Sequence, residues 1–565
     1  MGLDPRLRDA ALRWIADDPD PATRTELQKL LVDAMTGTAA VPTVDPAGSA
    51  SGPMVGSAGS ASGPMVGSAG SPSGPLADAL SGPLRFGTAG LRGPVRAGPA
   101  GMNVAVVRRA TAGLAAWLVA RGARGRTVVV GRDARHGSEA FAREAAGVLA
   151  AAGFAVHVLP GPAPTPLLAF AVRRRGAAAG VQITASHNPP QDNGYKVYLG
   201  EGVSDAPGAQ LVSPADAEIE AAIAAAPPAV AVPAEGPTTV DDPGEEYLDR
   251  VAHLGTATAG LRIALTPLHG VGGATAVHAL ARSGFTDVHV VPEQAAPDPD
   301  FPTVDFPNPE EPGATDLLLV LAERTSADLA IALDPDADRC ALGVPTATGP
   351  RMLTGDETGV LLGDHLLRRR TGLVATTVVS SSMLAKVAAA HGAPSAETLT
   401  GFKWIVRAGP ELVYGYEEAL GYCVDPEAVR DKDGIAAAVV AADLAAGLKA
   451  AGRTLLDRLD ELSRAHGVHR TVGISLRMAP EQRDAVLARL AAAPPEGWAV
   501  DRPADDVLRL RREDARVVVR PSGTEPKLKA YLEVVEPPTD DLDAARARAD
   551  GRMAALREEI TRLIG

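Results

Sequence analysis

Short apolar runs alternate with longer segments of helical spacing over most of the chain. Each short run ends in a polar loop, and the longer segments repeat apolar residues every three or four positions. Such alternation is typical of βαβ units, whose helices cover a largely parallel sheet. The first round predicts helices over 104–121, 138–152 and 165–175, and strands over 127–131, 155–159 and 180–184.

The same alternation recurs twice further along the chain. The second round predicts strands over 262–266, 287–291 and 329–334, with helices over 274–284 and 315–325. The third round predicts a strand over 373–379, a helix over 382–392 and a strand over 411–416. The fold class we expect is therefore α/β, with three tandem units built on mixed or parallel sheets.

The two ends of the chain follow other patterns. The C-terminal end predicts an α+β unit with strands over 469–477, 506–511, 516–520 and 529–535 and helices over 480–493 and 540–563. The N-terminal end predicts a helix over 8–35, followed by a Gly, Ser, Ala and Pro tract over 46–75 that repeats GSASGPMV. Such a tract buries too little apolar surface to offset its chain entropy, so we expect a disordered insert.

These patterns together predict four domains, in agreement with a length of 565 residues. We expect an N-terminal α/β domain with the insert, a second and a third α/β domain, and a C-terminal α+β domain. Their expected ranges are 1–225, 240–345, 346–465 and 466–565, with a Pro/Ala-rich linker over 226–240.

Composition narrows the class of partner. Lys plus Arg number 55 against 69 Asp plus Glu, a formal net charge of −14, which argues against nucleic acid or an anionic membrane. Cys340 and Cys423 fall in different expected domains, so neither a disulfide framework nor a cysteine metal site is indicated. The N-terminus has no secretion-signal pattern. The apolar stretch 435–452 is interrupted by Asp443 and Lys449, so it predicts a buried helix rather than a membrane span. We therefore expect a cytoplasmic protein.

A serine follows the predicted strand over 180–184, in the segment TASHNPP that carries Ser186 and His187. Prolines hold this loop at the carboxyl end of a strand, where open α/β sheets bind ligands. Ser186 is therefore a candidate nucleophile, although a turn with a cap-forming serine gives the same local pattern.

Three alternating aspartates follow the apolar run over 329–333, in the segment DPDADR that contains Asp334, Asp336 and Asp338. Carboxylates at alternate positions converge on one hard cation, and an oxygen-only set suits magnesium or calcium. A calcium-binding EF-hand loop is excluded, because Arg339 and Pro345 stand where that loop needs glycine and glutamate. A solvated turn is the alternative.

A third segment, RPSGTEPK from Arg520, lies between two predicted strands of the C-terminal unit. Its arginine, hydroxyls and free backbone amides make a phosphate cradle, and a tight hairpin is the alternative. Weaker candidates are the glycine-rich loop GTAGLRG from Gly87, the segment TGFK from Thr400 and the paired acids Glu417 and Glu418.

In this order, the motifs resemble the α-D-phosphohexomutase superfamily, which includes phosphoglucomutases, phosphomannomutases and phosphopentomutases. The resemblance covers roughly residues 84 to 535 and implies four domains around a central cleft. It implies that Ser186 carries a phosphoryl group and joins the three aspartates in binding Mg²⁺. It further implies catalytic roles for His187, Lys196, Arg92 and Arg339, and substrate contacts for Thr400, Gly401, Lys403, Glu417, Glu418, Arg520, Ser522, Gly523 and Thr524.

The sugar loop departs from the commoner hexomutases, because Ala419 stands where they have a serine. This version is similar to the branch with phosphopentomutases and glucose-1,6-bisphosphate synthases. The function we expect is a phosphoglucomutase that uses glucose 1,6-bisphosphate as intermediate, with phosphomannomutase, phosphopentomutase or bisphosphate synthase as alternatives. We expect a monomer or homodimer that binds small sugar phosphates. A phosphohydrolase with an aspartate nucleophile and a non-catalytic sugar-phosphate sensor are the rival classes.

Overall fold

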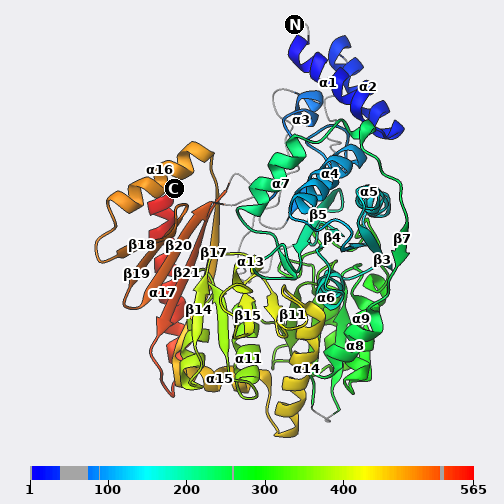
Figure 1. Cartoon of the computed structure of the whole chain (residues 1–565). Coiled ribbons are helices and arrows are strands. Elements are labelled where there is room, and N and C mark those ends of the chain that lie inside the picture. Colours follow the sequence, from blue (N-terminus) through cyan, green and yellow to red (C-terminus); the bar gives the residue numbers. More distant parts are fainter. Residues whose placement is uncertain (1–2, 38–73, 88–89, 257–259, 522–526) are drawn as a thin grey trace, which may run out of the picture.

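The computed structural model of the chain describes residues 3–37, 74–87, 90–256, 260–521 and 527–565. Four β-sheets with flanking helices follow one another along these residues (Figure 1). Of the expected insert over 46–75, only Gly74 and Pro75 are described, so the predicted disorder of 46–73 lies outside the described residues. Pro75 already begins a short helix.

The first sheet has the strand order β1-β5-β4-β2-β3-β7, with β6 added beside β5. Strands β4, β2, β3 and β7 are parallel, whereas β5 runs antiparallel to both β4 and β1. The strands are β1 (Leu91–Pro94), β2 (Thr127–Arg132), β3 (Ala155–Pro162), β4 (Ala179–Ile183), β5 (Asp192–Leu199), β6 (Ala209–Gln210) and β7 (Thr238–Val240). The helices are α4 (Val104–Ala120), α5 (Ser138–Ala151), α6 (Thr165–Arg174), α7 (Ala215–Ala224) and the 3-10 helix η1 (Ala229–Ala231).

The second sheet has the order β12-β11-β10-β8-β9, in which β10, β8 and β9 are parallel and β11 is antiparallel. Its strands are β8 (Arg262–Thr266), β9 (Asp287–Val290), β10 (Leu329–Leu333), β11 (Cys340–Val344) and β12 (Arg351–Met352). Its helices are α8 (Gly244–Ala252), α9 (Gly273–Arg282), the 3-10 helix η2 (Pro292–Gln294) and α10 (Asp316–Thr325).

The third sheet has the order β14-β13-β15-β16, again with three parallel strands and one antiparallel strand, β16. Its strands are β13 (Leu373–Thr377), β14 (Ser395–Thr398), β15 (Leu412–Glu417) and β16 (Gly421–Cys423). Its helices are α11 (Gly355–Leu367), α12 (Met383–Ala390), α13 (Phe402–Ile405), α14 (Gly434–Ala450) and α15 (Leu455–His466).

The fourth sheet is antiparallel throughout, with the order β17-β21-β20-β19-β18. Its strands are β17 (Val468–Arg477), β18 (Ala499–Ala504), β19 (Val507–Arg512), β20 (Ala515–Pro521) and β21 (Lys527–Glu536), and its helices are α16 (Pro480–Ala492) and α17 (Leu542–Ile564). The predicted fold class, three mixed α/β units followed by an α+β unit, is confirmed.

Two expectations need correction. The helix predicted over 8–35 is two helices, α1 (Pro5–Asp17) and α2 (Pro21–Thr36), which pack with α3 (Pro75–Ala79). The break arises because the Asp20 side chain caps α2 and a proline opens that helix. The linker expected over 226–240 also contains β7, which pairs with β3 and so extends the first sheet.

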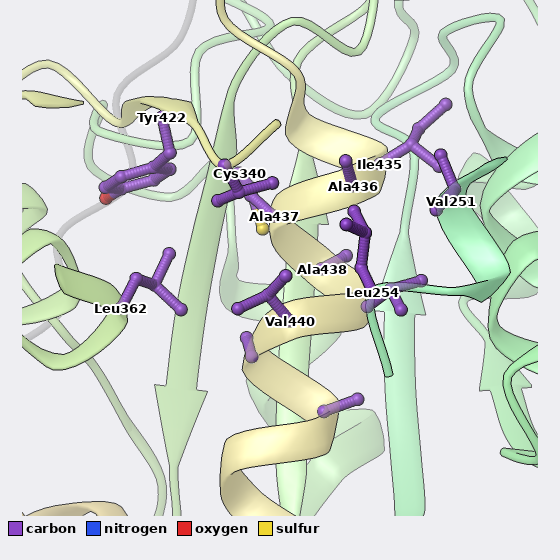
Figure 2. Packing of buried hydrophobic residues seen from close by; sticks show 14 of the residues in the cluster. Val251, Leu254, Cys340, Leu362, Tyr422, Ile435, Ala436, Ala437, Ala438 and Val440 are labelled. Atoms are coloured by element: carbon purple, nitrogen blue, oxygen red, sulfur yellow. The ribbon is translucent and has the colours of Figure 1, made fainter. Parts of the chain in front are cut away.

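Helix α14 packs in the core between the second and third units (Figure 2). From Ile435 to Ala442 every side chain is buried, and the small alanines let neighbouring elements approach closely. Val251 and Leu254, from α8 and the residues after it, belong to the same core cluster. None of the described helices is by itself long and apolar enough to cross a membrane, and α14 with α15 passes that test only as a pair bent by 89°.

Candidate active site

The predicted site loops occupy equivalent places in the first three sheets. Each loop follows a strand with a parallel neighbour, β4, β10 or β15, and leads into the adjacent antiparallel strand, β5, β11 or β16. The loop with Ser186, the loop with Asp334 and the loop with Glu418 are therefore three versions of one connection. The segment from Arg520 likewise lies between antiparallel β20 and β21.

Ser186 is held in a buried loop with a left-handed backbone, at φ 55°. A non-glycine residue in this region is strained, and such strain is concentrated at functional sites. The Ser186 amide donates to Thr184 Oγ1 at 2.9 Å, and the buried Arg135 guanidinium donates to the Ser186 carbonyl at 2.7 Å. The hydroxyl donates to Asp334 Oδ2 at 2.8 Å and lies 3.2 Å from His187 Nδ1. The serine of the first unit thus reaches the aspartates of the second.

Asp334, Asp336 and Asp338 each offer one oxygen to a group whose members lie within 4.8 Å of one another, and all three are buried. Burial and the charges of its two neighbours raise the pKa of Asp334 well above its ordinary value. Within the described residues, Oδ1 of Asp336 and Oδ1 of Asp338 have no hydrogen-bond partner. Crowded buried carboxylates with open oxygens suit a divalent cation, so the residues present fit the Mg²⁺ that the sequence predicts.

The loop of the aspartates is shaped by close backbone packing. Ala337 adopts a left-handed φ of 57°, and the backbone amide of Gly434 donates to its carbonyl at 3.1 Å. A Cβ on Gly434 would lie 2.4 Å from the carbonyl oxygen of Arg339, so no other residue fits there without a shift. The start of α14 thereby fixes the loop of the second unit.

Two lysines balance the aspartates. Lys196 Nζ on β5 lies 2.6 Å from Asp336 Oδ2 and 2.9 Å from Asp338 Oδ2. Burial alone would lower the pKa of Lys196, but these two carboxylates raise it, so the amine holds its proton. Lys432, just before α14, lies 3.2 Å from Asp338 Oδ2. Thr165 Oγ1 donates to Asp336 Oδ2 at 2.6 Å.

Arginines surround the serine and the aspartates. Arg92 on β1 donates to Asn188 Oδ1 at 3.2 Å, and the Arg339 amide donates to Asp334 Oδ1 at 3.0 Å. Burial and the positive charges of Arg339 and Arg92 lower the pKa of His187 well below its ordinary value, so this imidazole is neutral at pH 7. The structure therefore brings together all five predicted catalytic residues.

The third unit contributes the two predicted glutamates. Burial raises the pKa of Glu417, and the positive charges of Lys432 and Arg339 partly offset this rise. The Glu417 carboxyl therefore lies within electrostatic reach of both cations. Glu418 accepts from Ser380 Oγ at 2.9 Å, and burial together with Glu417 raises its pKa to about 7. Arg339 and Gly421 form an isolated bridge that ties this loop to the loop of the aspartates.

The segment with Thr400, Gly401 and Lys403 lies to one side of the aspartates. Phe402 connects it to the site, because Lys432 Nζ lies 5.6 Å from the centre of its ring. Burial lowers the pKa of Lys403, and the charged groups that act on it are Asp216 and Arg407. Gly401 has a φ of 113°, a conformation that favours glycine.

The C-terminal unit reaches the same region through β20 and β21. Burial and the negative charge of Glu418 raise the pKa of Tyr531, whereas Arg520, which shares a hydrogen bond with it, acts in the opposite direction. Tyr531 thus connects Arg520 of the C-terminal unit with Glu418 of the third unit. Ser522, Gly523 and Thr524 lie outside the described residues.

Three side chains that contact the site loops have no motif in the sequence. Arg135 braces the serine loop and also donates to the carbonyl of Pro189 at 2.8 Å. Thr165 and Lys432 contact the aspartates from α6 and from the residue pair before α14. Each is a single residue far from the motifs along the chain, so only the fold brings it to the site.

Comparison with known proteins agrees with this geometry. Family models for phosphoglucomutase/phosphomannomutase α/β/α domains I, II and III and for the C-terminal domain match residues 83–228, 245–347, 354–465 and 474–549. A "Probable phosphomannomutase" of Haemophilus influenzae is 40% identical over 481 residues, which cover 81% of this chain and 98% of that protein. The chain belongs to the phosphoglucomutase/phosphomannomutase family.

Relatives within this family differ in the sugar that their names give. A "Probable phosphoribomutase" of Schizosaccharomyces pombe is 33% identical and covers 76% of this chain and 83% of that protein. The structure of a phosphoglucomutase/phosphomannomutase family protein from Burkholderia thailandensis has the same fold, with a TM-score of 0.65, 22% identity and coverage of 83% and 96%. The resemblance to the α-D-phosphohexomutase superfamily is thus confirmed, and the chain is a phosphomutase of the kind that acts on small sugar phosphates.

Proposed function

We propose that this phosphomutase interconverts glucose 1-phosphate and glucose 6-phosphate through a phosphoryl group carried on Ser186. The observation that carries the proposal is the Ser186 hydroxyl, which lies 2.8 Å from Asp334 inside a group of three buried carboxylates. A serine that only capped a turn would not need to lie beside a cation site. This arrangement suits a hydroxyl that receives and returns phosphate.

In the proposed reaction, the bond between phosphorus and Ser186 Oγ breaks as phosphorus bonds to the free hydroxyl of a sugar monophosphate. The product is glucose 1,6-bisphosphate, which turns around and returns its other phosphate to Ser186. Lys196 already holds a proton at Nζ between Asp336 and Asp338, and it would give this proton to the Ser186 oxygen as the bond to phosphorus breaks. The proton that leaves the sugar hydroxyl would then restore the lysine, so the number of protons is conserved. Neutral His187 lies against Ser186 Oγ and orients it.

Ser186, Asp334, Asp336 and Asp338 are the residues that would hold magnesium. When bound, the cation supplies positive charge that offsets the charge on the transferring phosphoryl group. Arg92 and Arg339 add fixed positive charge around the same position, since both act electrostatically on the neighbouring aspartates.

The phosphate that is not reacting needs its own binding place. Arg520 supports this role because it is the second-last residue of β20 and bonds Tyr531, a side chain on which Glu418 of the third unit also acts. Glu417 and Glu418 would accept hydrogen bonds from sugar hydroxyls. One fixed phosphate site then serves both orientations of the bisphosphate.

A pentose phosphate is the second candidate substrate. The observation that favours it is that relatives at 33% to 36% identity are named phosphoribomutase or phosphopentomutase. A panel of glucose, mannose, ribose and deoxyribose 1-phosphates, each with magnesium and a trace of the matching bisphosphate, ranks these sugars by kcat/KM. The proposal expects the highest value for glucose 1-phosphate.

The serine itself is tested by Ser186→Ala. We expect kcat to fall by about 10⁴-fold or more, because the group that carries phosphate is removed. Intact mass should show one phosphate on the wild type and none on the variant, and Ser81→Ala, on an exposed turn, should behave as wild type. Release of inorganic phosphate without isomerisation would favour a phosphohydrolase, and binding without turnover would favour a sensor.

A further inference from the structure

A pocket outside the active site lies at the far ends of helices α11 and α14, which begin at the active site. It has a volume of about 320 Å³, within the range of roughly 300–1,000 Å³ that small-molecule sites occupy. Its walls come from the ends of α11 and α14 and the start of α15, and include Arg368, Arg369, Arg453 and Arg458. None of its lining residues belongs to the catalytic group described above.

The pocket is separate from the active site. Helix α14 starts beside Lys432 and Arg339, whereas its pocket residues begin at Asp443. Ten residues of α-helix span about 15 Å. A ligand held at this end therefore does not reach Ser186 or the aspartates.

Four arginines gather around this pocket, in a chain whose formal net charge is −14. Asp364 pairs with Arg458 at 2.8 Å and with Arg368 at 3.1 Å, and Asp443 pairs with Arg369 at 2.7 Å. With Glu461, which pairs with Arg453 and Arg458, three carboxylates face four guanidinium groups. Each of the four arginines therefore has an acidic partner, and Arg368 and Arg369 keep further N–H groups beyond these ion pairs.

Two of the arginines present their charge to the cavity. The side chains of Arg368 and Arg369 are 52% and 36% exposed, and each is paired with a carboxylate through one of its nitrogens. If these residues only neutralised the negative end of α11, they would bond its last carbonyl groups. Arg370, in contrast, does bond a carbonyl, that of Val424 at 3.0 Å.

We propose that this pocket, which we call the arginine pocket, binds a small phosphate-bearing metabolite. Guanidinium groups bind phosphate oxygens through paired N–H donors, and several around one cavity favour a compact polyanion. Asp364 and Asp443, which hold Arg458 and Arg369 in place, are buried, so these donors are oriented before a ligand arrives.

Gly447 provides a direct test. It lines the arginine pocket from α14, and a Cβ built on it has no atom within 4 Å. Gly447→Glu therefore places a carboxylate in the cavity without a clash and leaves every arginine in place. Gly447→Ala is the matched control, and both changes improve helix propensity.

The measurement is calorimetric titration with pyrophosphate in the absence of divalent cations. The wild type and Gly447→Ala should bind at two sites, one at the active site and one in the arginine pocket. Gly447→Glu should retain the first site and lose the second, with affinity at least about tenfold weaker. Unchanged two-site binding in Gly447→Glu, or a single site in the wild type that the variant leaves intact, would overturn the proposal.

Arg369→Gln with Arg453→Gln provides an independent variant that removes two of the donors. It should lose the same site, whereas Arg13→Gln with Arg324→Gln, two exposed arginines elsewhere, should keep it. Succinate should bind the pocket at least about tenfold more weakly than pyrophosphate, and equal binding would contradict the assignment to phosphate. Ser186→Ala should leave the pocket unchanged, so a failure of the proposed mutase reaction is distinguishable from a failure of this site.

Discussion

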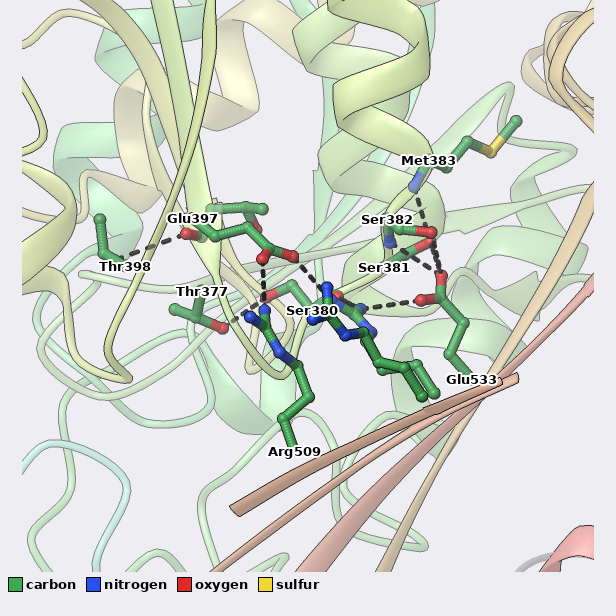
Figure 3. A network of polar contacts seen from close by, with 12 residues as sticks. Thr377, Ser380, Ser381, Ser382, Met383, Glu397, Thr398, Arg509 and Glu533 are labelled. Atoms are coloured by element: carbon green, nitrogen blue, oxygen red, sulfur yellow. Dashed lines mark hydrogen bonds and ion pairs between the residues drawn. The ribbon is translucent and has the colours of Figure 1, made fainter. Parts of the chain in front are cut away.

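The third unit joins its two neighbours through opposite kinds of chemistry. Helix α14 packs toward the second unit almost entirely through buried alanine, valine and leucine side chains (Figure 2). Toward the C-terminal unit, the third unit presents serines and Glu397, which meet arginines and Glu533 (Figure 3). We call the first the α14 joint and the second the polar joint.

The polar joint is built around two glutamates. Glu533 on β21 accepts from Ser381 Oγ at 2.9 Å and from the Ser382 amide at 2.8 Å, and it pairs with Arg516 at 2.8 Å. Glu397 on β14 pairs with Arg516 at 2.7 Å and with Arg509 at 2.8 Å. A small apolar group packs beside them, made of Val378, Val379, Val507 and Val518 with Ala504 and Tyr531 against it.

This difference indicates which part of the molecule can move. Separating the α14 joint exposes apolar surface, which costs about 25 cal/mol of free energy per Å². Water forms no hydrogen bonds with this surface that would offset the cost. Separating the polar joint exposes groups that water can bind, so its net free-energy cost is much smaller. We therefore expect the first three units to behave as one body and the C-terminal unit to open and close over the substrate.

A charge placed in the α14 joint should have the largest effect on stability. Ala438→Asp puts a carboxylate at a fully buried position, and we expect the free energy of unfolding to fall by about 4 kcal/mol or more. Urea unfolding followed by tryptophan fluorescence measures this loss. Ala450→Asp, on the exposed end of the same helix, should cost far less, and equal losses for both variants would contradict an apolar joint.

Acid should loosen the polar joint while the α14 joint holds. Burial alone would raise the pKa of Glu533, but His469 and Arg516 lower it from 4.5 to about 2. Because the folded-state pKa is the lower one, this stabilisation is present above pH 4.5 and is lost as the pH falls from about 4.5 to 2. The shift corresponds to about 3 kcal/mol.

Glu533→Gln tests whether the charge of Glu533 is the source of this pH dependence. Its stability deficit against the wild type, measured by urea unfolding, should be largest at pH 7 and should shrink as the pH falls toward 2. A deficit that stays constant over this range would show that the charge of Glu533 does not hold the joint.

The sequence predicts the chemistry of the site better than it predicts how the site is assembled. The loops of Ser186 and Asp334 follow continuous apolar strands, which are easily recognised. The antiparallel strands β5 and β11 after them are not predicted. Asp192, Asn193 and Lys196 interrupt the apolar pattern of β5, and β11 is a five-residue strand that contains Gly343. Arg135 and Lys432 could not be found either, since each is a single residue that only the packing of separate units brings to the site.

The two joints also differ in how well the sequence predicts them. The apolar run over 435–452 predicts a buried helix directly. The polar joint depends on Glu397, Arg516 and Glu533, which resemble ordinary surface residues on their strands. Nothing in their spacing indicates that they meet across a boundary, so their pairing is known only from the structure.

The smallest expected effect tests whether Glu397 closes the polar joint. Glu397→Gln removes its ion pairs with Arg509 and Arg516, which keep Asp501 and Glu533 as partners, so we expect a cost of about 1 kcal/mol or less. Hydrogen exchange of residues 379–382 should be faster in the variant. Raising the ionic strength from about 0.1 M to 1 M, which shortens the Debye length from about 10 Å to 3 Å, should speed exchange in the wild type but change the variant little.

The control for this prediction is Asp287→Asn, which removes an exposed ion pair with Arg262 inside the second unit. Exchange over 379–382 should be the same as in the wild type, because that pair crosses no joint. If Glu397→Gln kept the full salt response of the wild type, the charges of Glu397 would not hold the C-terminal unit. The serine contacts of Glu533 would then be the part of the polar joint that resists opening, and its closing force would be hydrogen bonding rather than charge.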